Sequence, residues 1–314
     1  RDMIFVGIDV IGDYLTEKYG CRVMKLPINA NLGCPNRDGT ISSGGCIFCS
    51  DEGSASPTSL VSDNIIAQME NAELSFSREF DRTEFIAYFQ SFTNTYAEIS
   101  VLKKMYDTAL SYHDVTGLMI GTRPDCISED ICRFISEYNK PGFELWIELG
   151  MQSSHDKSLN FLRRGHSNSD TIKAVDLCNR YGINICLHVI LGIPGESWQD
   201  MMDTAILISR LPVQGIKFHH LHVIRGTALS EIYAESSFRL LSINEYISTL
   251  CDFLERTPKN ILIHRISGDR EEQSLIAPKW GMLKGSIQTG IENEFSRRGS
   301  WQGFLCDLDY YSSR

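Results

Sequence analysis

Six short apolar runs alternate with helix-like segments along most of this 314-residue chain. Each run is rich in β-branched or aromatic residues, and Gly, Pro, Asn or Ser follows within a few residues. The runs are Arg22–Ile28, Glu84–Phe89, Thr116–Ile120, Phe143–Leu149, Ile183–Ile190 and Ile216–His222. Consecutive strand–helix units favour a parallel sheet with right-handed crossovers, and six units are two short of a closed eightfold barrel. We therefore predict an α/β fold, a partial (βα)6 TIM-type barrel with its functional groups at the carboxyl ends of the strands.

Helical patterns fill the intervals and continue beyond the sixth strand. They cover Ser128–Asn139, Asp170–Tyr181, Ser197–Arg210, Ser242–Arg256 and Lys284–Arg298, most of them starting at a capping residue. A short strand is expected at Ile261–His264. The pattern thus predicts a barrel domain over residues 1–235 and a small α+β C-terminal extension over residues 236–314, which closes the barrel or contacts the substrate.

Composition narrows the class of protein. The net charge of −10 argues against a general nucleic-acid binder, so DNA is not an expected partner. No apolar run is long enough to span a bilayer, and residues 1–11 lack the basic flank and cleavage site of a signal peptide. We expect a soluble cytoplasmic protein without membrane contact. In that setting, ten cysteines indicate metal binding or catalysis rather than a disulfide framework.

Three cysteines lie close together in the loop after the first strand. Cys34, Cys46 and Cys49 have the spacing C-x11-C-x2-C within a stretch rich in Gly, Asn, Pro and Ser. Such a stretch does not form a helix and is able to wrap around a ligand. Thiolates are soft ligands that select iron–sulfur clusters or zinc.

The number of ligands separates these two metals. A structural zinc site uses four protein ligands, but no fourth Cys or His lies nearby, since Cys21 precedes the strand and the next cysteine is Cys126. Three thiolates leave one iron of a four-iron cluster open to a small molecule. We therefore predict a [4Fe–4S] cluster on Cys34, Cys46 and Cys49, with a non-catalytic zinc-binding module as the alternative.

Two phrases in this loop carry a family resemblance. They are C-P-N-R-D-G over residues 34–39 and G-G-C-x-F-C over residues 44–49. The loop resembles the cluster loop of radical S-adenosylmethionine (SAM) enzymes, and the chain is similar to the YhcC/YtqA subgroup from about Tyr19 to Gly303. It is more distantly similar to the Elongator catalytic subunit and to oxygen-independent coproporphyrinogen oxidase.

The resemblance implies a partial barrel of the radical SAM type and a definite chemistry. The open iron binds the amino and carboxylate groups of SAM, and one electron cleaves the sulfonium to give methionine and a 5′-deoxyadenosyl radical. That radical abstracts a hydrogen atom from the substrate. The cofactors implied are a [4Fe–4S] cluster and SAM, and the partner implied is a reductant such as flavodoxin or ferredoxin.

The resemblance also assigns SAM contacts at the strand ends. The backbone of Gln90 and Ser91 receives the amino group, Gln152 contacts the ribose region, and Arg164 holds the carboxylate, which its planar fork matches. His188 aligns with a position that binds ribose hydroxyls. The adenine contacts implied are Phe48, Gly192 and Gly195.

Glu148 is a candidate on physical grounds. It lies in the otherwise apolar run Leu145–Leu149, where a carboxylate is costly unless it is paired or functional. We place it among the cofactor-binding candidates, and the sequence assigns no catalytic residue.

The substrate expected from the resemblance is the wobble uridine of tRNA. The C-terminal segment adds cations and aromatic residues suited to phosphate contact and base stacking, namely Lys279, Trp280, Lys284, Arg297, Arg298 and Trp301. A small metabolite or a protein side chain is the alternative substrate.

Overall fold

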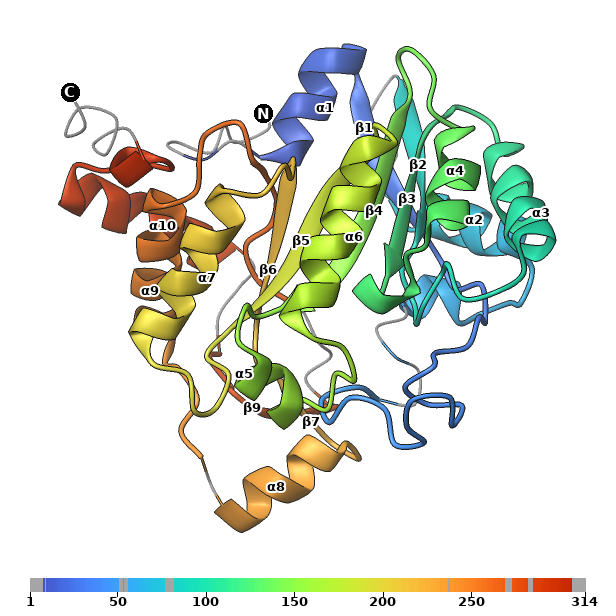
Figure 1. Ribbon diagram of the computed structural model, residues 1–314. Coiled ribbons are helices and arrows are strands. Elements are labelled where there is room, and N and C mark those ends of the chain that lie inside the picture. The colour runs from blue at the N-terminus through green and yellow to red at the C-terminus, as the bar shows by residue number, and fades with distance from the viewer. Residues whose placement is uncertain are drawn as a thin grey trace.

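Seven parallel strands form one curled, open sheet in the computed structural model (Figure 1). The structure describes residues 8, 10–50, 53, 56–76, 82–236, 238–268, 273–281 and 285–306. In sheet order the strands are β1 (Arg22–Ile28), β2 (Thr83–Phe89), β3 (Val115–Thr122), β4 (Glu144–Gln152), β5 (Asn184–Leu191), β6 (Gly215–His220) and β8 (Leu262–Arg265). The predicted partial barrel is confirmed, and the seventh strand comes from the predicted C-terminal segment.

Helices cover the outer face of this sheet (Figure 1). They are α2 (Ile65–Leu74), α3 (Ile99–Leu110), α4 (Glu129–Ser136), α6 (Asn168–Arg180), α7 (Trp198–Ser209), α9 (Ile243–Glu255) and α10 (Gly285–Arg298). Helix α6 begins earlier than predicted, because Ser167 is its N-cap and Asp170 is the third residue of a capping box. Ser197 and Ser242 start α7 and α9 in the same way.

Smaller elements lie at the two edges of the sheet. The carboxyl edge, at the bottom of Figure 1, carries α5 (Asp156–Phe161), α8 (Ala228–Ser236) and the antiparallel pair β7 (Val223–Ile224) and β9 (Leu275–Ala277). Two 3₁₀ turns, Pro57–Ser59 and Pro124–Cys126, follow β1 and β3. Helix α1 (Ile11–Tyr19) lies at the opposite, amino edge.

Successive side chains of each strand point to opposite faces of the sheet, which gives two buried layers. Side chains such as Leu26, Ile28 and Leu118 face the helices and form the main core. The other face points into the barrel, where Ile11 and Leu15 of α1 pack in one cluster with the residues Ile86, Met119, Trp146 and Cys186. Helix α1 therefore fills the amino end of the barrel.

Strand β8 lies within the predicted extension yet pairs in parallel with β6 of the barrel. The division at residues 235 and 236 stays a prediction. None of the helices in the described part of the chain has the length and apolar character needed to cross a bilayer.

Candidate active site

The loop after β1 folds back on itself through backbone hydrogen bonds. The carbonyl of Cys34 accepts from the N–H of Arg37 at 2.8 Å, and that of Asn36 accepts from Gly45 at 2.7 Å. The N–H of Cys49 donates to the carbonyl of Cys46 at 3.0 Å. These turns are specified by the Gly, Asn and Pro content of the loop, and they place all three cysteines at the carboxyl edge of the sheet.

Positive and polar groups converge on the sulfur atoms. Arg164 Nη1 lies 3.1 Å from Cys46 Sγ, and Asn36 Nδ2 lies 3.4 Å from the same sulfur. Arg37 Nη1 lies 3.7 Å from Cys49 Sγ. Burial raises the pKa of the Cys49 thiol, as does the neighbouring Cys46, whereas Arg37 and Arg164 act in the opposite direction. Charge-assisted N–H···S contacts of this kind stabilise thiolates, the form that binds metal.

The position of Arg164 depends on a glycine in β4. Arg164 is buried, and its Nη2 donates to the carbonyl of Gly150 at 2.8 Å. A Cβ at Gly150 would lie 2.8 Å from this same Nη2 and 3.0 Å from Nε2 of Gln152. The backbone N–H of Ile47 donates to the carbonyl of Leu162, which ties the cysteine loop to the segment that carries Arg164.

Replacing Gly150 with Ala is expected to displace Arg164 from Cys46. Because Arg164 is the predicted SAM carboxylate ligand, SAM affinity is expected to fall about tenfold, equal to about 1.4 kcal/mol. Iron content is expected to stay at the wild-type level, since Gly150 touches no cysteine. Equilibrium binding of SAM to anaerobically prepared protein measures the effect, and Gly12→Ala in α1, where a Cβ meets nothing within 4 Å, is the control for glycine loss. A parallel loss of iron would assign Arg164 a structural role.

The end of β2 carries unsatisfied polar atoms. Among the described residues, Ser91 Oγ, Thr93 Oγ1 and Asn94 Oδ1 are buried without a hydrogen-bond partner. The ring of Phe92 in this segment lies under the guanidinium of Arg37, 5.3 Å from its centroid. The predicted pair Gln90 and Ser91 therefore adjoins the cysteine loop, where a polar ligand would satisfy the orphaned atoms.

The ends of β4 and β5 have unusual backbone conformations. Gln152 has a φ of 70°, rare for a residue with a Cβ, and lies at a register shift between β4 and β5. Gly192 and Gly195 also have positive φ, and a Cβ at Gly192 would meet Leu241 at 2.9 Å. Phe48 packs in the cluster that holds Ile190 and Ile193 of the same region. The cysteine loop, with Phe48, and the turn after β5 therefore belong to one apolar cluster.

Glu148 and His188 lie one layer deeper in the barrel. The Glu148 side chain is fully buried, and its Oε2 accepts from Tyr88 Oη at 2.7 Å and Lys217 Nζ at 2.8 Å. His188 Nε2 lies 2.8 Å from the same oxygen. Lys217 and Lys25 hold the pKa of Glu148 well below its ordinary value against the opposing effect of burial. The structure joins both residues to this network, and their contact with SAM stays a prediction.

Sequence reasoning missed the partners of Glu148. Tyr88, Lys217 and His264 lie within strands whose hydrophobic content indicates burial, and they point inward by alternation. Burial lowers the pKa of Lys217 to about 8. The available signal was a lysine or histidine within several otherwise apolar strands, which puts several polar groups into one interior.

Two of these histidines predict how stability depends on pH. Burial lowers the pKa of His188 to about 4 and that of His264 to about 3, against about 6.5 in the unfolded chain. Between pH 6.5 and 4 the unfolded chain therefore binds protons at these rings that the folded chain does not. The free energy of unfolding is expected to fall as pH falls through this window, by about 1.4 kcal/mol per pH unit for each histidine.

Denaturant unfolding between pH 4 and 6.5 measures this slope. His188→Gln is expected to make it shallower. His113→Gln is the matched control, because the pKa of this half-exposed ring is raised by Asp114 and Glu73. An unchanged slope in His188→Gln would contradict the assignment of a neutral ring.

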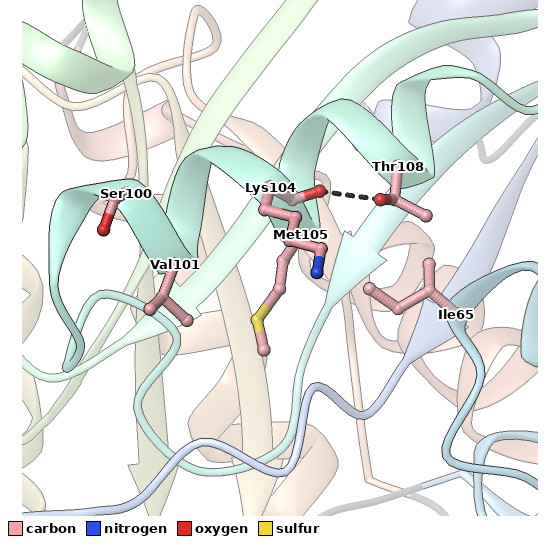
Figure 2. Close-up of a pocket in the computed structure, with 6 residues that line it drawn as sticks. All are labelled: Ile65, Ser100, Val101, Lys104, Met105 and Thr108. Carbon is pink, nitrogen blue, oxygen red and sulfur yellow. Dashed lines mark hydrogen bonds between the residues drawn. The ribbon is translucent and has the colours of Figure 1, made fainter.

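A groove of about 500 Å³ lies away from this site, between α2 and α3 (Figure 2). It is lined by Ile65, Ser100, Val101, Lys104, Met105 and Thr108. Thr108 Oγ1 donates to the carbonyl of Lys104, an ordinary helix contact. The groove lies on the outer helical layer and shares no residue with the cysteine loop.

The cations of the C-terminal segment are largely paired. Arg297 and Arg298 both bind Glu294, and Arg298 also binds Asp252 at 2.6 Å. Trp280 stacks on His220 with ring centroids 4.0 Å apart. Lys279 and Trp301 are exposed, while Lys284 lies outside the described residues. The predicted RNA-binding set therefore does not form one open basic face.

Sequence profiles and known relatives agree with this architecture. The Radical SAM superfamily profile matches residues 29–208, and the Radical_SAM C-terminal domain profile matches residues 213–297. The protein YtqA of Bacillus subtilis is 37% identical over 92% of this chain and 90% of its own length. The tRNA uridine(34) acetyltransferase of Methanocaldococcus infernus is 31% identical, over 53% of this chain and 31% of the relative.

A solved structure shares the fold. The archaeal Elp3 of Methanocaldococcus infernus superposes with a TM-score of 0.65 at 20% identity, covering 89% of this chain and 64% of that one. The family profile spans the cysteine loop and the strand ends that surround it. The chain therefore belongs to the radical SAM superfamily and its YhcC/YtqA subgroup, whose cofactors are a [4Fe–4S] cluster and SAM.

Proposed function

We propose that this protein reductively cleaves SAM at a cluster held by Cys34, Cys46 and Cys49, and thereby modifies a uridine of tRNA. Together, the bound cluster and SAM supply a 5′-deoxyadenosyl radical that abstracts hydrogen from the substrate. The observation that carries the proposal is the convergence of Arg164 and Asn36 on the sulfur of Cys46, at 3.1 and 3.4 Å. Two groups far apart in sequence approach one sulfur, an arrangement that stabilises a thiolate.

The spacing of the cysteines favours the cluster over zinc. A tetrahedral zinc with Zn–S bonds of about 2.3 Å holds its sulfurs about 3.8 Å apart. Within the described residues, a group of three potential ligand atoms within 4.8 Å of one another occurs only at Glu148, Cys186 and His264. Cys34, Cys46 and Cys49 do not form such a group, so their sulfur atoms do not all lie within 4.8 Å of one another, and a four-iron cluster is larger than one ion.

The residues around the cysteines suit an amino-acid nucleotide. Ser91 offers a buried, unsatisfied oxygen at the end of β2, and Arg164 offers a guanidinium at the end of the β4–α5 segment. Phe48 and Ile193 provide an apolar wall for a flat base. In this arrangement Arg164 orients a carboxylate, Ser91 accepts from an amino group, and the apolar wall excludes water.

The tRNA part of the proposal is supported by sequence similarity to a relative. A relative that matches half of this chain is named for acetylation of tRNA uridine 34. The exposed Lys279 and Trp301 offer a cation and a stacking surface near the C-terminal end. Paired Arg297 and Arg298 contribute little, so the RNA contact surface is expected to be small.

Anaerobic reconstitution tests the SAM part. Iron and sulfide are expected to give a brown protein that forms 5′-deoxyadenosine and methionine after reduction. A colourless, zinc-containing product that forms neither would overturn the proposal.

Mass comparison of tRNA nucleosides tests the substrate. Cells lacking the protein are expected to accumulate an unmodified uridine derivative, which wild-type protein removes and Cys46→Ala does not. Identical nucleosides in all three strains, with SAM cleavage intact in vitro, would favour a small metabolite or a protein side chain.

A further inference from the structure

The barrel interior holds more positive than negative charge in the layer below Gly150 and Gln152. Lys25 of β1 and Lys217 of β6 lie beside the carboxylate of Glu148 on β4, and Arg265 of β8 pairs in register with Lys217. Lys217 Nζ lies 2.8 Å from Oε2, and Lys25 Nζ lies 3.7 Å from Oε1. Two cations therefore share this carboxylate, and a third lies on the strand next to Lys217.

Within the described residues, no second acid is among the strongest neighbours of the members of this layer. Glu148 is the carboxylate that acts on Lys217, His188 and His264, while their other strong neighbours are Lys25, Lys217 and Arg265. Arg265 Nη2 lies 2.6 Å from the ring of His219, a neutral partner. Unmatched positive charge inside a protein is costly, and a bound anion would relieve it.

Several buried polar atoms in the same layer make no hydrogen bond. Within the described chain these are Glu148 Oε1, both ring nitrogens of His264, and Nε of Arg265, although His264 Nδ1 lies 3.5 Å and Lys25 Nζ 3.7 Å from that Oε1. His264 is completely buried, whereas Lys25 keeps 25% of its side chain exposed and His188 keeps 18%. Solvent therefore reaches one side of the layer, and Nε of Arg265 is a buried N–H donor that makes no hydrogen bond.

A metal ion is the competing occupant, because Glu148, Cys186 and His264 offer ligand atoms within 4.8 Å of one another. A dication there would lie beside Lys25 and Lys217, which already contact the carboxylate oxygens. Burial and Glu148 also raise the pKa of Cys186 well above its ordinary value, so the thiol keeps its proton. Both effects oppose a cation and favour an anion.

We propose that Lys25, Lys217 and Arg265 form a binding site for a small anionic group of the substrate, a carboxylate or a phosphate. The site lies one strand layer below Arg164 and Gln152, so an anion held here fixes how far the substrate enters the barrel. The inference rests on the proposed function only for the identity of the molecule that carries the anion.

Thermal unfolding of the full chain, without SAM, tests the site. At constant ionic strength, acetate and inorganic phosphate are titrated separately against chloride. A saturable rise in Tm is expected with at least one of the two, and the responding anion distinguishes a carboxylate from a phosphate. Arg265→Gln and Lys25→Gln are expected to weaken binding at least tenfold.

Lys25→Gln is the informative variant, because it keeps the close Lys217–Glu148 pair and so preserves the fold. Lys103→Gln, which removes an exposed lysine paired with Asp107, is the control for loss of one charge. No saturable response in the wild type, or an equal response in Lys25→Gln, would overturn the site, as would stoichiometric zinc binding that depends on His264. Failed SAM cleavage with intact anion binding would instead count against the proposed function.

Discussion

Alanine at Cys34, Cys46 or Cys49 is expected to reduce bound iron and SAM cleavage to background while the barrel stays folded. Each thiolate is one of three protein ligands, and two ligands do not hold a four-iron cluster. The loop keeps its backbone turns in these variants, because the carbonyls of Cys34 and Asn36 are unaffected by side-chain loss. Iron per chain and 5′-deoxyadenosine formation are the measurements, both under anaerobic conditions.

Cys21→Ala is the matched control, since this cysteine lies before β1 and outside the loop. It is expected to retain full iron and full activity. Full cleavage in any one of the three loop variants would show that the ligand set is wrong. Far-UV circular dichroism separates loss of cluster from loss of fold, because the sheet and helices do not depend on the thiolates.

Glu148→Gln is expected to lower the free energy of unfolding by about 3–5 kcal/mol. The substitution keeps the shape of the side chain but leaves Lys217 buried beside a neutral amide, with Lys25 nearby. Since the pKa of Glu148 lies well below its ordinary value, the carboxylate is charged at neutral pH and the full effect is present there. The stabilisation is expected to fade only as pH falls below about 4.5 toward the folded-state pKa.

Denaturant unfolding at pH 7 measures this change. The double variant Glu148→Gln with Lys217→Gln is expected to recover part of the loss, because no unpaired charge of that pair remains. Asp130→Asn removes an exposed partner of Arg133 and is expected to have no measurable effect. A change below about 1 kcal/mol in Glu148→Gln would mean that water or another group neutralises Lys217 in the variant.

Local pattern was sufficient to predict much of the fold. The six strands were recognised because parallel strands covered on both faces are continuous apolar runs, and their ends shifted by only a few residues. Helix α1 was missed, since its apolar residues Ile11 and Leu15 occupy little more than two turns. The pair β7 and β9 was missed because it joins segments about fifty residues apart, which no local period reveals.

The candidate site also has a part that the sequence predicts and a part that only the fold reveals. The cysteine loop is contiguous in sequence, so spacing alone was enough to propose it. The cost of burying Glu148 could also be predicted from the sequence, but its partners come from β1, β2, β5, β6 and β8, and only the curl of the sheet brings them together. Conversely, the sequence showed Arg297 and Arg298 as cations able to contact phosphate, but in the fold Glu294 pairs with both and Asp252 of α9 pairs with Arg298.

Helix α1 limits the end of the barrel from which a ligand can enter. With Ile11 and Leu15 packed in one cluster with Trp146, α1 fills the amino end of the barrel and leaves the carboxyl end, where the cysteine loop lies. If the substrate and SAM both enter from that end, as the proposed function implies, the ligand that lies deeper is expected to bind first and leave last.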